Sequence, residues 1–191
     1  MDFSVWEGMA VDPDRYVCGE PERTSDTVAW ILEKIPHAGR VLELGCGVGR
    51  LTIPIALATT CQIVAVDVAS RMVDAAPAHE RVSYIVNDGE SVPPGYFDGA
   101  YSVLMFQHLS ERYVRGYLHE MASALRPGAP FLFQYVVGNQ NFGLDHRYSR
   151  RTMLEWAYDA GLGVDEKKVW RDRMQYDWDW MLVDGRGYEN A

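Results

Sequence analysis

The stretch that most constrains the fold is Val41–Thr52, in which a short apolar run ends in three glycines at alternate positions. Gly45, Gly47 and Gly49 permit a tight turn with backbone angles that are closed to other residues. They also let the backbone come close to a ligand. A helical pattern starts straight after them, so free amides at the helix start would face that ligand. We therefore expect this turn to hold an adenosine-type cofactor.

Composition and charge narrow the class of protein. The 191 residues, 48% of them hydrophobic and 24% charged, suit one globular domain over residues 1–191. A net charge of -9 opposes binding to nucleic-acid backbones. The three cysteines form neither a CxxC motif nor a metal-ligand spacing, so we expect no metal and a reducing compartment. With no leader pattern and no membrane-spanning apolar run, the sequence predicts a cytoplasmic protein without membrane contact.

Strand and helix patterns alternate through the first two thirds of the chain. Apolar runs predict strands at 41–44, 62–67, 81–86, 97–105 and 130–137. Such alternation favours an α/β fold with a parallel sheet and right-handed crossovers. We assign residues 25–137 to a cofactor-binding core of this kind, opened by a helix that is capped within 24–26.

The two ends of the chain differ from this core. In 138–191, Ser149 or Thr152 starts a helix, and the strands expected at 163–170 and 174–183 lie close enough to form an antiparallel pair. Residues 1–24 carry apolar side chains without a sustained period. They are expected to form either an arm packed on the body or a lid over a pocket.

The expected ligand site lies beyond the carboxyl ends of the parallel strands, where strand order reverses. Asp67 ends the second strand, 22 residues after Gly45, where a carboxylate can accept both hydroxyls of a ribose. Asp88 follows the third strand and suits an exocyclic amino group such as that of adenine. Residues 105–108 follow the fourth strand and would border the reacting end of the cofactor.

The glycine spacing separates the nucleotide classes. The dinucleotide fingerprint places its third glycine three positions after the second, whereas Gly49 stands two positions after Gly47 and is followed by Arg50. No phosphate-binding GxxxxGK[ST] loop occurs. Glu43, inside the strand before the turn, suits a cofactor with a positively charged end better than a diphosphate.

With these features the sequence resembles the class I S-adenosylmethionine-dependent methyltransferases, and Val41–Thr52 looks like their first motif. The remaining correspondences are Asp67, Asn87-Asp88-Gly89, Phe97-Asp98, Met105-Phe106-Gln107-His108-Leu109 and Leu125-Arg126-Pro127-Gly128. The resemblance implies a Rossmann-like three-layer sandwich with a mostly parallel seven-stranded sheet and a C-terminal antiparallel hairpin. It is closest to small-molecule methyltransferases with "QHL" or "HHL" after the fourth strand.

The resemblance also implies which residues bind S-adenosyl-L-methionine. The backbone of Gly45, Gly47 and Gly49 would line its methionine part, with Glu43 acting through the turn or a water. The other implied contacts are Asp67 and Val68 at the ribose, Asp88 and Gly89 at the adenine, and the Met105 backbone near the methionine amine.

The expected reaction is in-line transfer of a methyl group to an O or N nucleophile of a small molecule. Its acceleration would come mainly from positioning. A base is needed only for a protonated acceptor, and His108 is the best-placed candidate, its alternative being a turn or cap residue without chemistry. The [DN]PP[YF] and Pro-Cys motifs of DNA methyltransferases are absent from the strand ends, which together with the charge favours a small acceptor over nucleic acid.

Two other functions stay open at this stage. The chain could be a non-catalytic S-adenosylmethionine-binding module or, less well supported, an NAD-dependent oxidoreductase. The sequence names neither the acceptor nor the oligomeric state.

Overall fold

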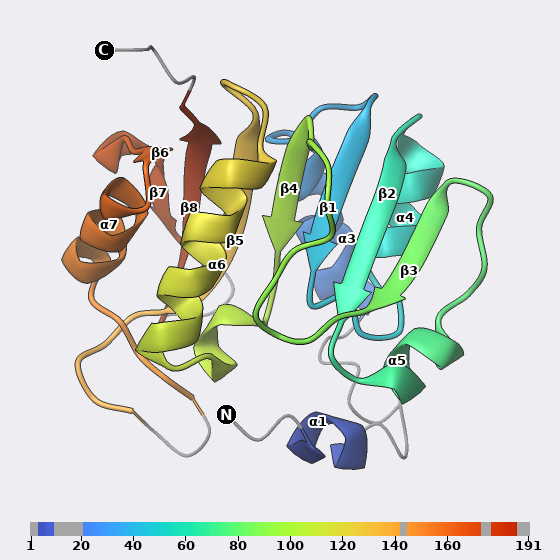
Figure 1. Ribbon diagram of the computed structural model, residues 1–191, viewed down its shortest axis with the longest axis horizontal. Helices are drawn as coiled ribbons and strands as arrows, with labels where there is room; N and C mark the ends of the chain where they lie inside the picture. The colour runs from blue at the N-terminus through green and yellow to red at the C-terminus, as the bar shows by residue number, and fades with distance from the viewer. Residues whose placement is uncertain (1–3, 10–20, 142–144, 173–176, 187–191) are drawn as a thin grey trace.

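In a computed structural model, which describes residues 4–9, 21–141, 145–172 and 177–186, the strands form one mixed sheet (Figure 1). Its order is β3-β2-β1-β4-β5-β8-β6, and β7 also pairs with β8. The strands are β1 (Arg40–Leu44), β2 (Gln62–Asp67), β3 (Val82–Val86), β4 (Gly99–Ser102), β5 (Pro130–Val136), β6 (Leu162–Gly163), β7 (Val169–Arg171) and β8 (Trp178–Gly185). The first five are mutually parallel and β8 is antiparallel to its neighbours, as predicted.

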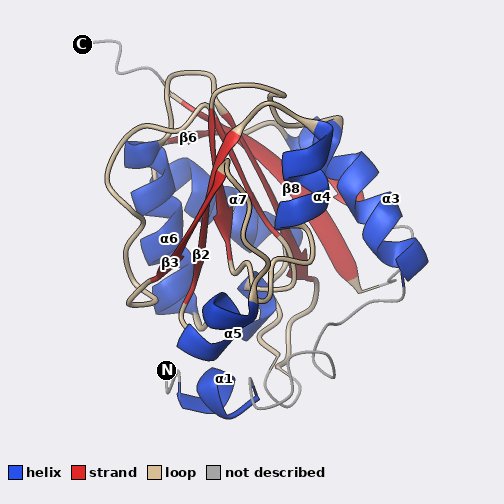
Figure 2. Cartoon of the chain, turned by 90° about the vertical axis from the view of Figure 1, so that its right-hand side faces the viewer, coloured by secondary structure: helices blue, strands red, loops and turns tan. Residues whose placement is uncertain are grey.

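Helices cover both faces of the sheet and make the predicted three layers (Figures 1 and 2). The helices are α1 (Ser4–Met9), α3 (Pro21–Leu32), α4 (Thr52–Ala58), α5 (Ser70–Ala75), α6 (Glu111–Ala124) and α7 (Arg150–Asp159). Two short 3-10 helices are η1 (Phe106–His108) and η2 (Glu166–Lys168). Helices α6 and α7 lie on one face, and α3 and α4 on the other. The Rossmann-like fold class is therefore confirmed.

Several element boundaries differ from those predicted. Helix α3 begins at Pro21, before the predicted caps in 24–26, and proline is well tolerated in a first helical turn. At α7 the structure selects Ser149 as the cap, because its hydroxyl accepts the Thr152 N–H at 3.1 Å. The strand predicted at 163–170 is split into β6 and β7 by η2, whose start is capped by the Asp165 carboxylate. The described sheet therefore has eight strands and not the seven predicted.

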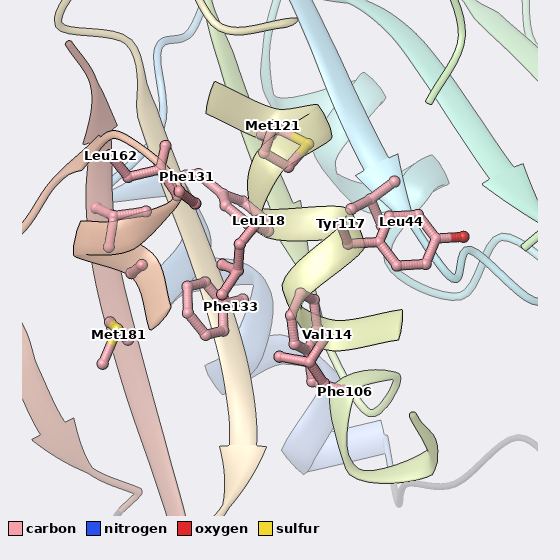
Figure 3. Packing of buried hydrophobic residues seen from close by; sticks show 14 of the residues in the cluster. Leu44, Phe106, Val114, Tyr117, Leu118, Met121, Phe131, Phe133, Leu162 and Met181 are labelled. Atoms are coloured by element: carbon pink, nitrogen blue, oxygen red, sulfur yellow. The ribbon is translucent and has the colours of Figure 1, made fainter. Parts of the chain in front are cut away.

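The apolar core explains why the parallel strands are almost continuously hydrophobic. Leu42 and Leu44 of β1 point to the face covered by α6, where they join a large buried cluster. Figure 3 shows its centre, where Phe106 stacks on Phe133 with ring centroids 4.8 Å apart, beside Val114 of α6. A second cluster lies between the sheet and helices α3 and α4. The cores hold β1, β2 and β4 rigidly side by side, and with them the ends that carry the candidate site.

Cys46 and Cys61 are buried free thiols, while Cys18 lies outside the described residues. Within the described ranges, no helix has both the length and the apolar character needed to cross a membrane.

Candidate functional site

The predicted site residues gather at one edge of the sheet. Because β1, β2 and β4 are parallel, their carboxyl ends meet there, and the glycine turn, Asp67 and η1 follow directly from them. Figure 1 shows this edge facing α5 and α1, which lie beyond the strand ends. Two groups of residues, one after β1 and β2 and one after β4 and β5, form its two halves.

The glycine turn after β1 has the left-handed backbone that its sequence predicts. Gly45, Gly47 and Gly49 have φ angles of 76°, 53° and 79°. The Gly45 and Cys46 amides both donate to the Val66 carbonyl, at 2.8 and 3.0 Å. A Cβ on Gly45 would lie 2.9 Å from the Met105 Cβ, whereas one on Gly47 would meet no atom within 4 Å. Packing requires the glycine at 45, and the backbone at Gly47 stays open to a ligand.

Asp67 joins the end of β2 to this turn. Its Oδ2 accepts the Gly47 N–H at 2.8 Å and its Oδ1 accepts the Ala69 N–H at 3.0 Å. Burial raises the pKa of this carboxyl and the backbone hydrogen bonds oppose the rise. Each carboxylate oxygen can accept a second hydrogen bond, and Val68 lies beside it, partly buried. The carboxylate thus fixes the turn and keeps acceptor capacity for ligand hydroxyls.

Glu43 supports the turn from inside the fold. Its side chain is buried, and its Oε2 accepts the Thr52 hydroxyl at 2.5 Å and the Tyr101 hydroxyl at 2.9 Å. Burial raises the pKa of Glu43 to about 7, against the effect of these two hydrogen bonds. Thr52 is the first residue of α4, so Glu43 reaches the turn through the helix that follows it. Since α4 begins three residues after Gly49, the Gly47 amide that Asp67 accepts belongs to the turn and not to the start of α4.

Asp88 is engaged mainly by its own loop. Its Oδ1 accepts the N–H groups of Glu90 and Ser91 at 2.9 and 2.8 Å and the Ser91 hydroxyl at 2.9 Å. These hydrogen bonds, the Glu90 one first, lower the pKa of the Asp88 carboxyl. Gly89 is buried with φ 77°. The structure therefore gives Asp88 a turn-forming role, and its contact with adenine stays a prediction.

An unusual backbone marks the end of β4. The strand ends at Ser102, earlier than predicted, and Leu104 has φ 59°, a left-handed conformation that is rare for a leucine. The Gln107 side-chain amide donates to the Leu104 carbonyl at 2.7 Å. The next residue, Met105, packs against Gly45. No sequence signal indicated the strain at Leu104.

His108 lies in η1, where its neighbour Gln107 and residues from two distant segments of the chain contact its ring. Its Nδ1 is 3.3 Å from Asp145 Oδ1, and its Nε2 is 3.0 Å from the Gln107 side-chain nitrogen. The Trp6 ring of α1 lies against the imidazole, with centroids 4.5 Å apart. Asp145 escaped the sequence analysis. Its only signal was a polar loop after the fifth strand.

Helix α1 reaches across the two halves of the edge. Besides Trp6 at His108, Glu7 Oε1 accepts the Ser70 N–H at the start of α5 at 2.5 Å. This hydrogen bond lowers the pKa of Glu7. Figure 2 shows α1 next to α5. The described part of the N-terminal arm therefore packs on the site, while Tyr16, another of its apolar residues, lies outside the described residues.

The described side chains offer no metal centre: nowhere among them do three or more His, Cys, Asp or Glu residues gather closely enough to hold an ion.

The sequence and the fold are similar to those of known methyltransferases. Residues 41–128 match the family described as "Methyltransferase domain". A curated relative, the O-methyltransferase rstn1 of Aspergillus nomiae, is 28% identical over 58% of this chain, and the match spans 56% of that relative's own length.

Solved structures extend the likeness over nearly the whole chain. Magnesium protoporphyrin IX methyltransferase from Synechocystis, solved with bound S-adenosylhomocysteine, superposes with a TM-score of 0.75 at 15% identity, covering 95% of this chain and 97% of that one. The putative methyltransferase complexed with the Trm112 activator of Haloferax volcanii has a TM-score of 0.75 at 17% identity, with coverage of 95% and 97%. The predicted resemblance to class I methyltransferases is confirmed.

Proposed function

We propose that this chain, which has the fold of the class I S-adenosylmethionine-dependent methyltransferases and matches their methyltransferase domain over 41–128, transfers a methyl group to a small molecule. The observation that carries the proposal is the glycine turn with its Asp67 partner. A carboxylate holds the Gly47 amide at 2.8 Å, and the space beside Gly47 is open. Such a cradle suits a nucleoside ligand with a non-bulky, positively charged tail.

The residues of this cradle fit S-adenosyl-L-methionine. Asp67 would accept ribose hydroxyls beside Val68, and the backbone of Gly45–Gly49 would line the methionine part near Met105. Asp88 and Gly89 would face the adenine, with Asp88 already fixed in its loop. When bound, this cofactor supplies a methyl group on a sulfonium, which is an excellent leaving group. The chain's own task is then to align the acceptor, exclude water and, for a protonated acceptor, remove a proton.

We assign the base role to His108, which lies at the reacting strand end. The side-chain nitrogen of Gln107 can only donate hydrogen bonds, and it donates one to the Leu104 carbonyl. At the 3.0 Å contact with His108, Nε2 is therefore the acceptor. A protonated O or N nucleophile would take the place of that amide at Nε2. An acidic chain of net charge -9 suits a small acceptor better than a nucleic acid.

Helix α1 is proposed to act as a lid. Its contacts with His108 through Trp6 and with Ser70 through Glu7 support this role, because they span the cofactor and acceptor halves of the edge. The cytoplasmic location stays a prediction.

Isothermal titration calorimetry tests whether the chain binds the proposed cofactor. We expect S-adenosylmethionine and S-adenosylhomocysteine to bind, and Asp67→Ala to weaken binding by roughly 1–3 kcal/mol through lost hydrogen bonds. Asp74→Ala, which removes an exposed carboxylate on neighbouring α5, is the matched control and should bind as wild type does. Absence of binding to either compound would sink the proposal, and binding of a nicotinamide cofactor instead would favour the oxidoreductase.

A second candidate is a non-catalytic cofactor-binding module. It is favoured by one observation: both ring nitrogens of His108 have a protein group within 3.3 Å, Asp145 at Nδ1 and Gln107 at Nε2. It predicts tight cofactor binding with no methyl transfer to a broad panel of phenols, carboxylates and amines. Methyl transfer to even one acceptor would show that the chain is an enzyme and not a binding module.

A further inference from the structure

We infer that Asp145 is a positioning residue which, with Gln107, fixes His108 as the tautomer protonated on Nδ1, so that Nε2 takes the proton of a methyl acceptor that displaces the Gln107 amide. This inference rests on the proposed function and deepens it. Asp145 comes from the loop after β5 and His108 from η1 after β4, so the pair exists only in the folded chain.

The tautomer follows from the partners of the imidazole. Gln107 Nε2 is a donor, since it lies 2.7 Å from the Leu104 carbonyl oxygen, which can only accept. Its second proton points to His108 Nε2 at 3.0 Å, which must therefore carry a lone pair. The proton of a neutral imidazole then sits on Nδ1, 3.3 Å from the Asp145 carboxylate. Both neighbours select the same tautomer.

The frame around this pair is held by the backbone. The His146 N–H donates to the Gln107 carbonyl at 2.6 Å, which ties the loop that carries Asp145 to η1. The Tyr148 hydroxyl donates to the Leu109 carbonyl at 2.6 Å and makes a second tie. The Trp6 ring lies against the imidazole with its plane tilted by 54°.

Gln107 also has unused capacity. It is 3% exposed, and within the described structure its Oε1 is buried without a hydrogen-bond partner. An unpaired buried amide oxygen is costly, so an acceptor O–H or N–H group would gain by pairing with it.

The step balances without any further reagent. The acceptor's proton passes to His108 Nε2, and the acceptor's electron pair forms the new bond to the methyl carbon. The carbon–sulfur bond breaks, and its electron pair stays on sulfur, which becomes a neutral thioether. His108 ends as an imidazolium whose Nδ1–H faces the Asp145 carboxylate.

The test combines imidazole ¹⁵N NMR with kinetics on the full chain. In ¹⁵N-histidine-labelled protein saturated with S-adenosylhomocysteine, His108 is assigned by its absence from His108→Gln. We expect a protonated Nδ1 and an unprotonated Nε2 in wild type, and a mixture of tautomers in Asp145→Asn/Gln107→Leu, which lacks both neighbours that select the tautomer. With an acceptor found by the panel, kcat of Asp145→Asn should fall roughly tenfold or more while KM for the cofactor is unchanged.

Control variants distinguish a failure of this inference from a failure of the proposed function. Asp159→Asn, the same chemical change on an exposed part of α7, should leave both spectrum and kcat as in wild type. Asp145→Glu should restore part of the activity, and if Asp145→Asn does not fold, the wild-type tautomer and Asp145→Glu decide. A protonated Nε2 in cofactor-bound wild type, or an unchanged kcat in Asp145→Asn, overturns the inference alone. Failure to bind either S-adenosyl compound overturns the proposed function first.

Discussion

The two halves of the carboxyl edge are built in different ways. The cofactor half comes from one βαβ unit, in which Asp67 reaches Gly47 only 20 residues away. The acceptor half joins α1, η1 and the loop after β5, so that His108 meets both Trp6 and Asp145. Local contacts repeat in every chain with the same short motif, whereas distant ones depend on the whole fold. The contacts of the cofactor half can therefore be predicted from the sequence, whereas those of the acceptor half cannot.

The glycine turn should be the least tolerant part of the molecule. Gly45→Ala forces a left-handed alanine and a Cβ 2.9 Å from the Met105 Cβ. We expect a loss of roughly 2–5 kcal/mol in the free energy of unfolding, from backbone strain and overpacking together. Urea denaturation measures it.

Gly47→Ala is the matched control for this turn. The added Cβ meets no atom within 4 Å, so the variant should lose only the cost of a left-handed alanine, roughly 1–2 kcal/mol in the free energy of unfolding. It should nevertheless weaken cofactor binding, because the Cβ fills the open space. Equal destabilisation by the two variants would show that packing against Met105 does not set the turn.

Glu43 should make the stability of the cofactor half depend on pH. Its folded pKa of about 7 lies above the ordinary value of 4.5, so between these values the folded chain holds a proton that the unfolded chain releases. Stability therefore falls as pH rises through this window, by about 1.4 kcal/mol per pH unit or roughly 3 kcal/mol in all.

Glu43→Gln should remove this slope. Denaturation curves from pH 4.5 to 8 compare it with wild type and with Glu155→Gln, whose carboxylate is exposed. If wild type and Glu43→Gln have parallel stability profiles, the buried carboxylate is not the source.

Trp6→Ala probes the acceptor half. It removes the ring that lies 4.5 Å from the His108 ring, and aromatic pairs contribute roughly 0.5–1.5 kcal/mol beyond buried area. We expect KM for the acceptor to rise roughly 2- to 10-fold with cofactor affinity unchanged. Trp6→Phe should keep most of the effect of the ring. A loss of cofactor affinity as large as that of acceptor affinity would argue that α1 serves both halves equally.

Asp88→Asn should have the smallest effect. The amide oxygen of asparagine can still accept the Glu90 and Ser91 amides, so the loop after β3 keeps its shape. We expect cofactor affinity to change less than about threefold, which is under 0.7 kcal/mol. Titration with S-adenosylhomocysteine checks this, beside Asp67→Asn in the cofactor half. A tenfold loss of cofactor affinity would instead support the direct contact between Asp88 and adenine that the sequence predicted.

The sequence patterns predicted the sheet well but not its details at the site. Periodicity located β1, β2, β4 and β5 because they are buried on both faces and read as apolar runs, and it also located the edge strand β3, which is largely exposed. It placed the end of β4 too late, since the left-handed turn at Leu104 has no glycine to announce it. It also joined β6 and β7, because the capping role of Asp165 is a local hydrogen bond that apolar periodicity does not contain.

The sequence by itself determined the glycine turn, the acid at the end of β2 and the fold class, because these depend on backbone angles and on contacts within one βαβ unit. Only the tertiary structure decided how those parts are used. It bound Asp67 to the Gly47 amide, placed Glu43 beneath α4, and turned Asp88 into its own loop. It also brought Asp145 and Trp6 to His108. Such pairings between segments far apart in the chain arise only when the sheet fixes where each loop ends.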